Sequence, residues 1–158
     1  NLNESSLLPH MTPSSGSGTE LQSEYFVKYE VACQALDALW AISRHFRHLI
    51  LVTEVRMVLG DEILMSPVFS PTGDSQRFIA IHFTWRPQGD GVSRAIRQVE
   101  GALEPFGAKP HLGKLFSYST RALGKVYGEN LAVFRQLVLD LDPHGKFSNR
   151  FTREQLAI

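Results

Sequence analysis

Residues 79–85 read IAIHFTW, a run in which large apolar side chains alternate with small or polar ones. Successive side chains of a β-strand point to opposite faces of a sheet, so positions 79, 81, 83 and 85 would share one apolar face. His82 and Thr84 would lie on the other face. The run therefore predicts a strand whose first face packs on a core and whose second face is polar.

A second run, residues 49–57, is rich in Val, Ile and Leu and predicts another strand. Within it Glu54 and Arg56 would project from one face, two residues apart, as an ion pair. If the polar faces of both strands align in one sheet, this pair joins His82 and Thr84 in a cluster of donors and acceptors suited to hydroxyl groups. Alternation alone leaves a second interpretation open, in which this is simply the solvated face of an antiparallel sheet.

Spacing and turn residues predict the remaining elements. Helical repeats occupy residues 31–42 and 126–141, and a further helix is predicted from Asp90, as its N-cap, to about Leu103. The turn at 142–145 would end the last of these helices. Strands are predicted at 21–27, 49–57, 63–69 and 78–85. The sum is an α+β domain with helices covering one face of a largely antiparallel sheet.

Length and charge limit the classes of function. A chain of 158 residues has the size of one domain, and residues 1–20, rich in Pro, Ser and Gly, are expected to be a connecting loop before a domain at 21–158. Sixteen basic residues balance sixteen acidic ones, which argues against nucleic acid as a partner. No apolar run is long enough to span a membrane.

The single cysteine and the missing motifs narrow the chemistry. Cys33 has no partner for an internal disulfide, is expected to be a small buried hydrophobe, and suits a reducing compartment such as the cytoplasm. Zinc-ligand spacings, a Gly-rich phosphate loop and a nucleophile elbow are absent from the sequence. Any redox chemistry would therefore depend on a cofactor bound mainly elsewhere.

Residues 110–116, Pro-His-Leu-Gly-Lys-Leu-Phe, resemble the Pro-His-Trp-Gly-Lys motif of the alditol and aldonolactone oxidases, which are vanillyl-alcohol-oxidase-like flavoenzymes. Leu112 replaces the usual Trp, so it either alters substrate choice or fills the same core site. Further segments resemble the alditol (xylitol or sorbitol) oxidase branch in the same order: 12–15, 20–25, 54–56, 82–85, 105–108 and 141–147. The resemblance covers nearly the whole chain.

The resemblance implies a parent enzyme in which an N-terminal domain binds FAD and a C-terminal cap domain, represented by this chain, holds the substrate. The implied reaction oxidises a terminal CH2OH of a polyol to the aldehyde with O2, giving H2O2. This chain alone would be inactive. An aldonolactone oxidase domain and a stand-alone polyol-binding module are the alternatives.

The resemblance also assigns roles to five residues. Arg56 and Lys114 would bind the reacting oxygen and stabilise its developing negative charge, and His82 would relay the proton. Glu54 and Thr84 would hold hydroxyl groups further along the substrate. Neither a metal site nor a complete cofactor site is expected within the chain.

Overall fold

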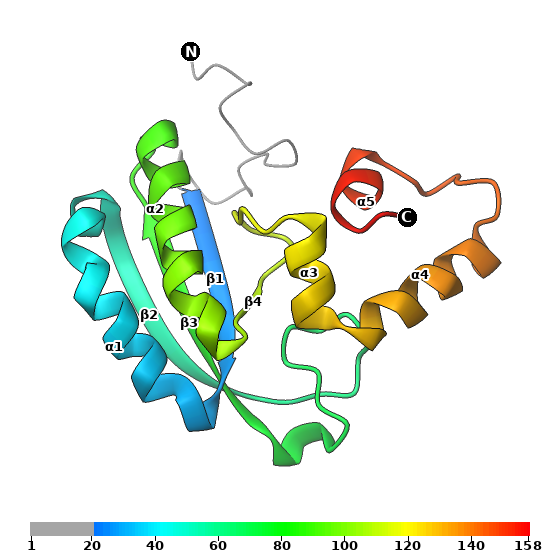
Figure 1. Cartoon of the computed structure of the whole chain (residues 1–158), viewed down its shortest axis with the longest axis horizontal. Helices are drawn as coiled ribbons and strands as arrows, with labels where there is room; N and C mark the ends of the chain where they lie inside the picture. The colour runs from blue at the N-terminus through cyan, green and yellow to red at the C-terminus, as the bar shows by residue number, and fades with distance from the viewer. Residues whose placement is uncertain (1–20) are drawn as a thin grey trace.

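The computed structural model describes residues 21–158, so the predicted connecting loop at 1–20 lies outside the described residues. Its centre is a four-stranded sheet in which all paired strands are antiparallel. The strands are β1 (Leu21–Lys28), β2 (Ile50–Leu59), β3 (Arg77–Trp85) and β4 (Lys109–Pro110), in the order β2-β3-β1-β4. Helices α1 (Ala32–Ile42) and α2 (Gly89–Leu103) lie across one face of this sheet (Figure 1). The predicted α+β architecture is confirmed.

The main core lies between the sheet and these two helices. Ile81, Phe83 and Trp85 on β3 are at most 3% exposed, as the alternation predicts. Phe83 and Trp85 stack with ring centroids 5.1 Å apart. Removing each such side chain from water contributes about 1.5–3 kcal/mol, so this face holds the sheet and helices together.

A smaller core on the opposite face overturns one prediction. It consists of Phe26, Phe78, Ala80 and Val68, and Val68 comes from the segment predicted as a strand at 63–69. That segment is not a strand: it has only an isolated bridge between Asp61 and Phe69. The Asp61 carboxylate accepts hydrogen bonds from the Ile63 amide and the Ser66 hydroxyl, which favours a turn over an extended chain.

Two helix predictions also need correction. Gln88, not Asp90, is the N-cap of α2, and Asp90 lies in the first turn, where its charge favours the helix dipole. The predicted helix at 126–141 is two helices, α3 (Thr120–Tyr127) and α4 (Glu129–Leu141). The break is Gly128, at φ 54° and ψ −131°, a conformation open essentially to glycine.

The end of the chain contains the predicted turn and one helix that spacing did not reveal. Gly145, in the turn that follows α4, has a φ of 65°, and its amide donates to the Asp142 carbonyl at 3.0 Å. Helix α5 (Arg150–Gln155) starts with a capping box between Asn149 and Thr152. Short 3-10 turns lie at 29–31, 43–45, 47–49, 73–75 and 104–106.

Cys33 is exposed, so the prediction that it is buried was wrong. Helix α1 turns Ala32, Ala35 and Leu39 toward the core, and position 33 falls on the outer side. Among residues 21–158, no helix combines the length and apolar character needed to cross a membrane.

Candidate functional site

A row of polar side chains crosses the sheet on the face away from α1 and α2. In the register, Glu54 on β2 pairs with His82 on β3, and His82 pairs with Glu24 on β1. Directly paired residues of antiparallel strands project to the same face with Cβ atoms about 4.5–5.5 Å apart. The predicted alignment of the polar faces is thus present, with one carboxylate on each side of the histidine.

Lys114 reaches this row from the segment that follows β4. The backbone ties that segment to β1: the His111 amide donates to the Glu24 carbonyl at 2.9 Å, and the Leu115 amide donates to the Gln22 carbonyl at 2.8 Å. Between these anchors the Lys114 ammonium donates to Glu24 Oε2 at 2.6 Å and approaches His82 Nδ1 at 3.0 Å. Two of its three N–H groups therefore have protein partners.

Gly113 shows why small size matters in the segment before Lys114. Its amide donates to His111 Nδ1 at 3.1 Å. A Cβ at position 113 would meet the His111 ring at 3.2 Å, which is closer than most carbon contacts. A side chain here would therefore push the imidazole away and loosen the turn that carries Lys114.

Glu54 and Arg56 form the ion pair that alternation predicted, and both side chains are about half exposed. The guanidinium lowers the pKa of the Glu54 carboxyl by hydrogen bonding and by its charge, and the carboxylate raises the pKa of Arg56 by the same two effects. Arg56 Nη1 also lies 4.0 Å from Glu24 Oε1. The pair thus forms the open edge of the cluster.

His82 is 5% exposed and lies in the middle of the row. Burial, and then the charge of Lys114, lower its pKa. An ammonium group can only donate, so Nδ1 must accept from Lys114, and the ring proton is assigned to Nε2. Nε2 lies 3.2 Å from Thr84 Oγ1, which then accepts its hydrogen bond. The geometry selects a neutral imidazole of defined tautomer.

The structure brings all five sequence-predicted site residues to one face and adds Glu24, which sequence reasoning missed. The side chain of Glu24 is 7% exposed, and its oxygens face Lys114, His82 and Arg56. Applying alternation to residues 21–27 would have placed Gln22 and Glu24 on one face. Only the register with β3 shows that this face is the one that carries His82.

The cluster interleaves fixed acceptors and donors. It contains two carboxylates, two cations, one imidazole and one hydroxyl, a set that can hydrogen-bond several hydroxyl groups at once. No group of three His, Cys, Asp or Glu side chains within 21–158 could hold a metal ion. Leu112 packs against the main core, which favours the interpretation that it fills a core position.

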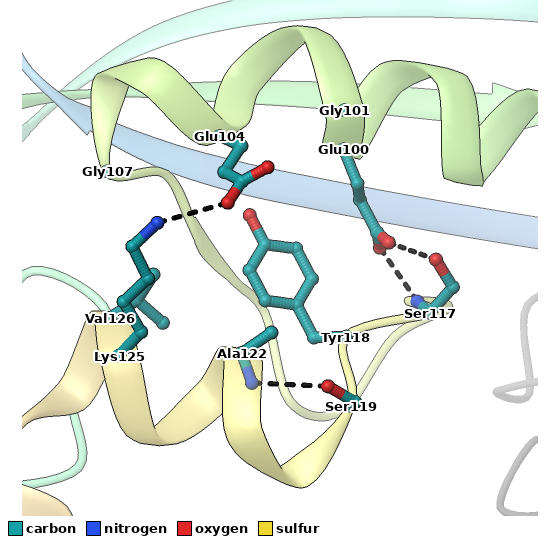
Figure 2. A pocket seen from close by; sticks show the side chains of 10 residues that line it. All are labelled: Glu100, Gly101, Glu104, Gly107, Ser117, Tyr118, Ser119, Ala122, Lys125 and Val126. Atoms are coloured by element: carbon teal, nitrogen blue, oxygen red, sulfur yellow. Dashed lines mark hydrogen bonds and ion pairs between the residues drawn. The ribbon is translucent and has the colours of Figure 1, made fainter.

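A groove of about 460 Å³ lies away from this cluster, between α2 and α3 (Figure 2). Its most buried charged group, Glu100, accepts hydrogen bonds from the Tyr25 hydroxyl at 3.0 Å and from both the amide and the hydroxyl of Ser117. Lys125 and Glu104 pair at 3.0 Å beside it. Protein partners therefore occupy Glu100, while the Lys125–Glu104 pair is exposed to solvent.

Comparison with known proteins gives the class to which this fold and cluster belong. Residues 19–155 match a family model described as D-arabinono-1,4-lactone oxidase, and the chain belongs to that family. It is similar to a curated alditol oxidase of Streptomyces sp. (strain IKD472 / FERM P-14339), with 40% identity over 153 residues that cover 94% of this chain. The match covers 35% of that relative, so the chain spans about a third of its length. The resemblance found in the motifs is confirmed.

Proposed function

We propose that this chain is the substrate-binding domain of an FAD-dependent alditol oxidase, which oxidises a terminal CH2OH of a polyol such as xylitol or sorbitol to the aldehyde and reduces O2 to H2O2. One observation carries the proposal. The Lys114 ammonium lies between Glu24 and His82, on the sheet face that also presents the Glu54–Arg56 pair. The similarity to an alditol oxidase supports it.

The cluster would bind a polyol by matching its alternating hydroxyl groups. Glu54 is half exposed and accepts hydrogen bonds, while Thr84 can donate its own hydroxyl proton because its oxygen already accepts from His82. Together they would hold the hydroxyls further along the chain and fix the position of the reacting carbon. Binding at several hydroxyls would also reject shorter alcohols.

Lys114 and Arg56 are cations and would both bind the oxygen of the reacting hydroxyl. Within residues 21–158, two N–H groups of Lys114 have protein partners. The third would donate to the substrate oxygen as negative charge develops there. As the hydroxyl proton leaves, Lys114 would pass one of its protons to His82 Nδ1 and take the substrate proton in its place. The lowered pKa of His82 keeps the ring neutral and able to accept.

The half-exposed edge at Glu54 and Arg56 leaves this face open for a cofactor held mainly by another part of the parent protein. FAD bound there would supply the acceptor for the hydride that leaves the carbon, and dioxygen would reoxidise it. On this proposal the isolated chain is inactive. The unpaired, exposed thiol of Cys33 supports a reducing, cytoplasmic location.

The test is to purify the full-length parent protein and measure its flavin absorbance and its peroxide production with xylitol and sorbitol. We expect a bound flavin and peroxide that depends on the polyol. A protein without flavin, or a flavoprotein that gives no peroxide with any alditol, would overturn the proposal.

An aldonolactone oxidase is the second candidate, favoured by the description of the family model. Such an enzyme would prefer a lactone ring to an open chain, so the ratio of kcat/KM for the lactone to kcat/KM for xylitol separates the two. A stand-alone polyol-binding module is the third. Calorimetric binding of xylitol to the isolated chain without flavin would favour it.

A further inference from the structure

Glu24 is the more buried of the two carboxylates in the cluster and has no part in the roles proposed above. Its side chain is 7% exposed, and its three charged or titratable neighbours come from three different segments. Oε2 lies 2.6 Å from Lys114 Nζ and 3.8 Å from His82 Nδ1, and Oε1 lies 4.0 Å from Arg56 Nη1. Glu24 is therefore enclosed by these three side chains, whereas Glu54 and Arg56 are half exposed.

The position of Lys114 depends on this carboxylate. Lysine has a flexible four-carbon stem, and within residues 21–158 the ammonium has two hydrogen-bond contacts, one to Glu24 and one to the neutral ring of His82. The contact to Glu24 is the shorter and joins opposite charges, which makes it the stronger of the two. Without it, the ammonium would be free to swing toward solvent.

Glu24 also sets the net charge of the cluster. Lys114 and Arg56 contribute two positive charges, Glu54 and Glu24 contribute two negative charges, and His82 is neutral. The sum is zero. Loss of the Glu24 charge would leave a net positive site, and a partly buried positive site attracts carboxylates.

We propose that Glu24 is a positioning residue that fixes the Lys114 ammonium and keeps the cluster electrically neutral, so that the site takes uncharged polyols in preference to sugar acids. This inference rests on the proposed function of the same site. Glu24 would not touch the substrate. It would nevertheless determine the position of Lys114 and the preference for uncharged substrates.

The experiment uses the full-length flavoprotein with Glu24→Gln, which keeps the shape and removes the charge. We expect kcat with xylitol to fall on the order of 10²-fold, the effect of misplacing a reacting group by about 1 Å, while KM changes less. Glu62→Gln, at an exposed carboxylate outside the cluster, is the control and should match the wild type. An unchanged kcat in Glu24→Gln would overturn the positioning role.

Charge selectivity gives a second readout. The measured quantity is the inhibition constant of xylonate divided by the KM for xylitol, which should fall in Glu24→Gln because the site has become cationic. Glu24→Asp keeps the charge but withdraws it from Lys114, so it should lower kcat and leave this ratio near the wild-type value. A ratio that shifts equally in both variants, or in neither, would contradict the charge role. If Glu24→Gln loses its flavin, Glu24→Asp alone still decides the positioning role.

The titration of His82, followed by NMR of its ring nitrogens, tests the same contacts without activity. Burial, Lys114 and Arg56 lower its pKa, whereas the charges of Glu24 and Glu54 raise it. Removing the Glu24 charge should therefore shift the titration to lower pH, and the acid limb of kcat/KM should move with it. An unmoved titration overturns the inference even in an active enzyme. Absence of peroxide from the wild type would instead count against the proposed function.

Discussion

Two buried carboxylates, Glu24 and Glu100, lie on opposite sides of the same sheet and have opposite kinds of partners. Glu24 points from β1 to the polar face and meets Lys114 at 2.6 Å. Its neighbour Tyr25 points to the other face and donates to Glu100 at 3.0 Å. The carboxylate on the polar face is paired with a cation, and the one on the helix face is held by neutral hydroxyl and amide groups.

The difference shows that burial alone does not identify a functional site. Burial raises the pKa of Glu100, which would make it a candidate for catalysis on electrostatic grounds. Its three hydrogen bonds, however, all come from Tyr25 and Ser117 and join β1 and α2 to the segment before α3. The Glu24 cluster instead opens toward the half-exposed Glu54–Arg56 pair. Cationic partners and a half-exposed edge are what distinguish the candidate site.

The largest expected effect is the loss of catalysis on replacing the cation of the polar face. In the full-length protein, Lys114→Met should lower kcat/KM for xylitol by about 10²–10³-fold, as expected when a donor to a developing oxyanion is removed. Lys125→Met is the matched control, because Lys125 pairs with Glu104 on the other side of the sheet. The measurement is the rate of peroxide production. Similar losses of activity in the two variants would show that the polar face has no special role in catalysis.

Removing the structural carboxylate should reduce stability. Glu100→Ala leaves the Tyr25 hydroxyl and the Ser117 amide unsatisfied in the interior, at a cost of about 2–3 kcal/mol in the free energy of unfolding. Urea denaturation measures this cost. Glu104→Ala, at an exposed ion pair in the same groove, should cost less than about 1 kcal/mol. Equal costs would show that Glu100 does not hold the elements together.

A smaller effect is expected at Thr84, the last residue of the hydrogen-bonded row. Thr84→Val removes the acceptor of His82 Nε2 and a donor to the substrate. Loss of the one neutral hydrogen bond to the substrate should lower kcat/KM by up to about tenfold. Thr84→Ser keeps the hydroxyl and should restore most of the activity. Steady-state kinetics of both variants provide the measurement, and an inactive serine variant would argue against the hydroxyl as the important group.

The smallest expected effect is a pH dependence of stability that originates at Glu100. Its folded-state pKa is raised above the ordinary value of 4.5, so the folded protein favours the protonated carboxyl. The resulting stabilisation is present below the unfolded-state pKa and is lost as pH rises through the folded-state pKa. The free energy of unfolding of the wild type relative to Glu100→Gln should therefore decline from acid toward neutral pH. A difference that grows with pH would reverse this assignment.

The sequence predicted the fold where a local pattern determines it and failed where a distant partner does. Alternation in 79–85 correctly assigned both faces of β3, because burial of Ile81 and Trp85 leaves one register open. The segment at 63–69 has apolar residues suited to a strand, but Asp61 and Ser66 hold it in turns over Phe78. Gly128 interrupts a continuous helical pattern because its backbone has a positive φ, which the spacing of apolar residues cannot predict.

The candidate site was predicted in the same uneven way. His82 and Glu54 followed from alternation, and Lys114 from the motif at 110–116 that contains it. Glu24 was missed because its role is defined by contact with Lys114, 90 residues away, and by pairing with β3. Such contacts between distant segments are visible only once the register of the sheet is known.

The central claim is that a polyol binds on the polar face of the sheet, and a crystal structure of the full-length protein with xylitol tests it most directly. The account predicts one substrate hydroxyl oxygen within about 2.6–3.2 Å of Lys114 Nζ and another within the same range of a Glu54 carboxylate oxygen. Xylitol bound only in the groove between α2 and α3, beside Glu100, would contradict it.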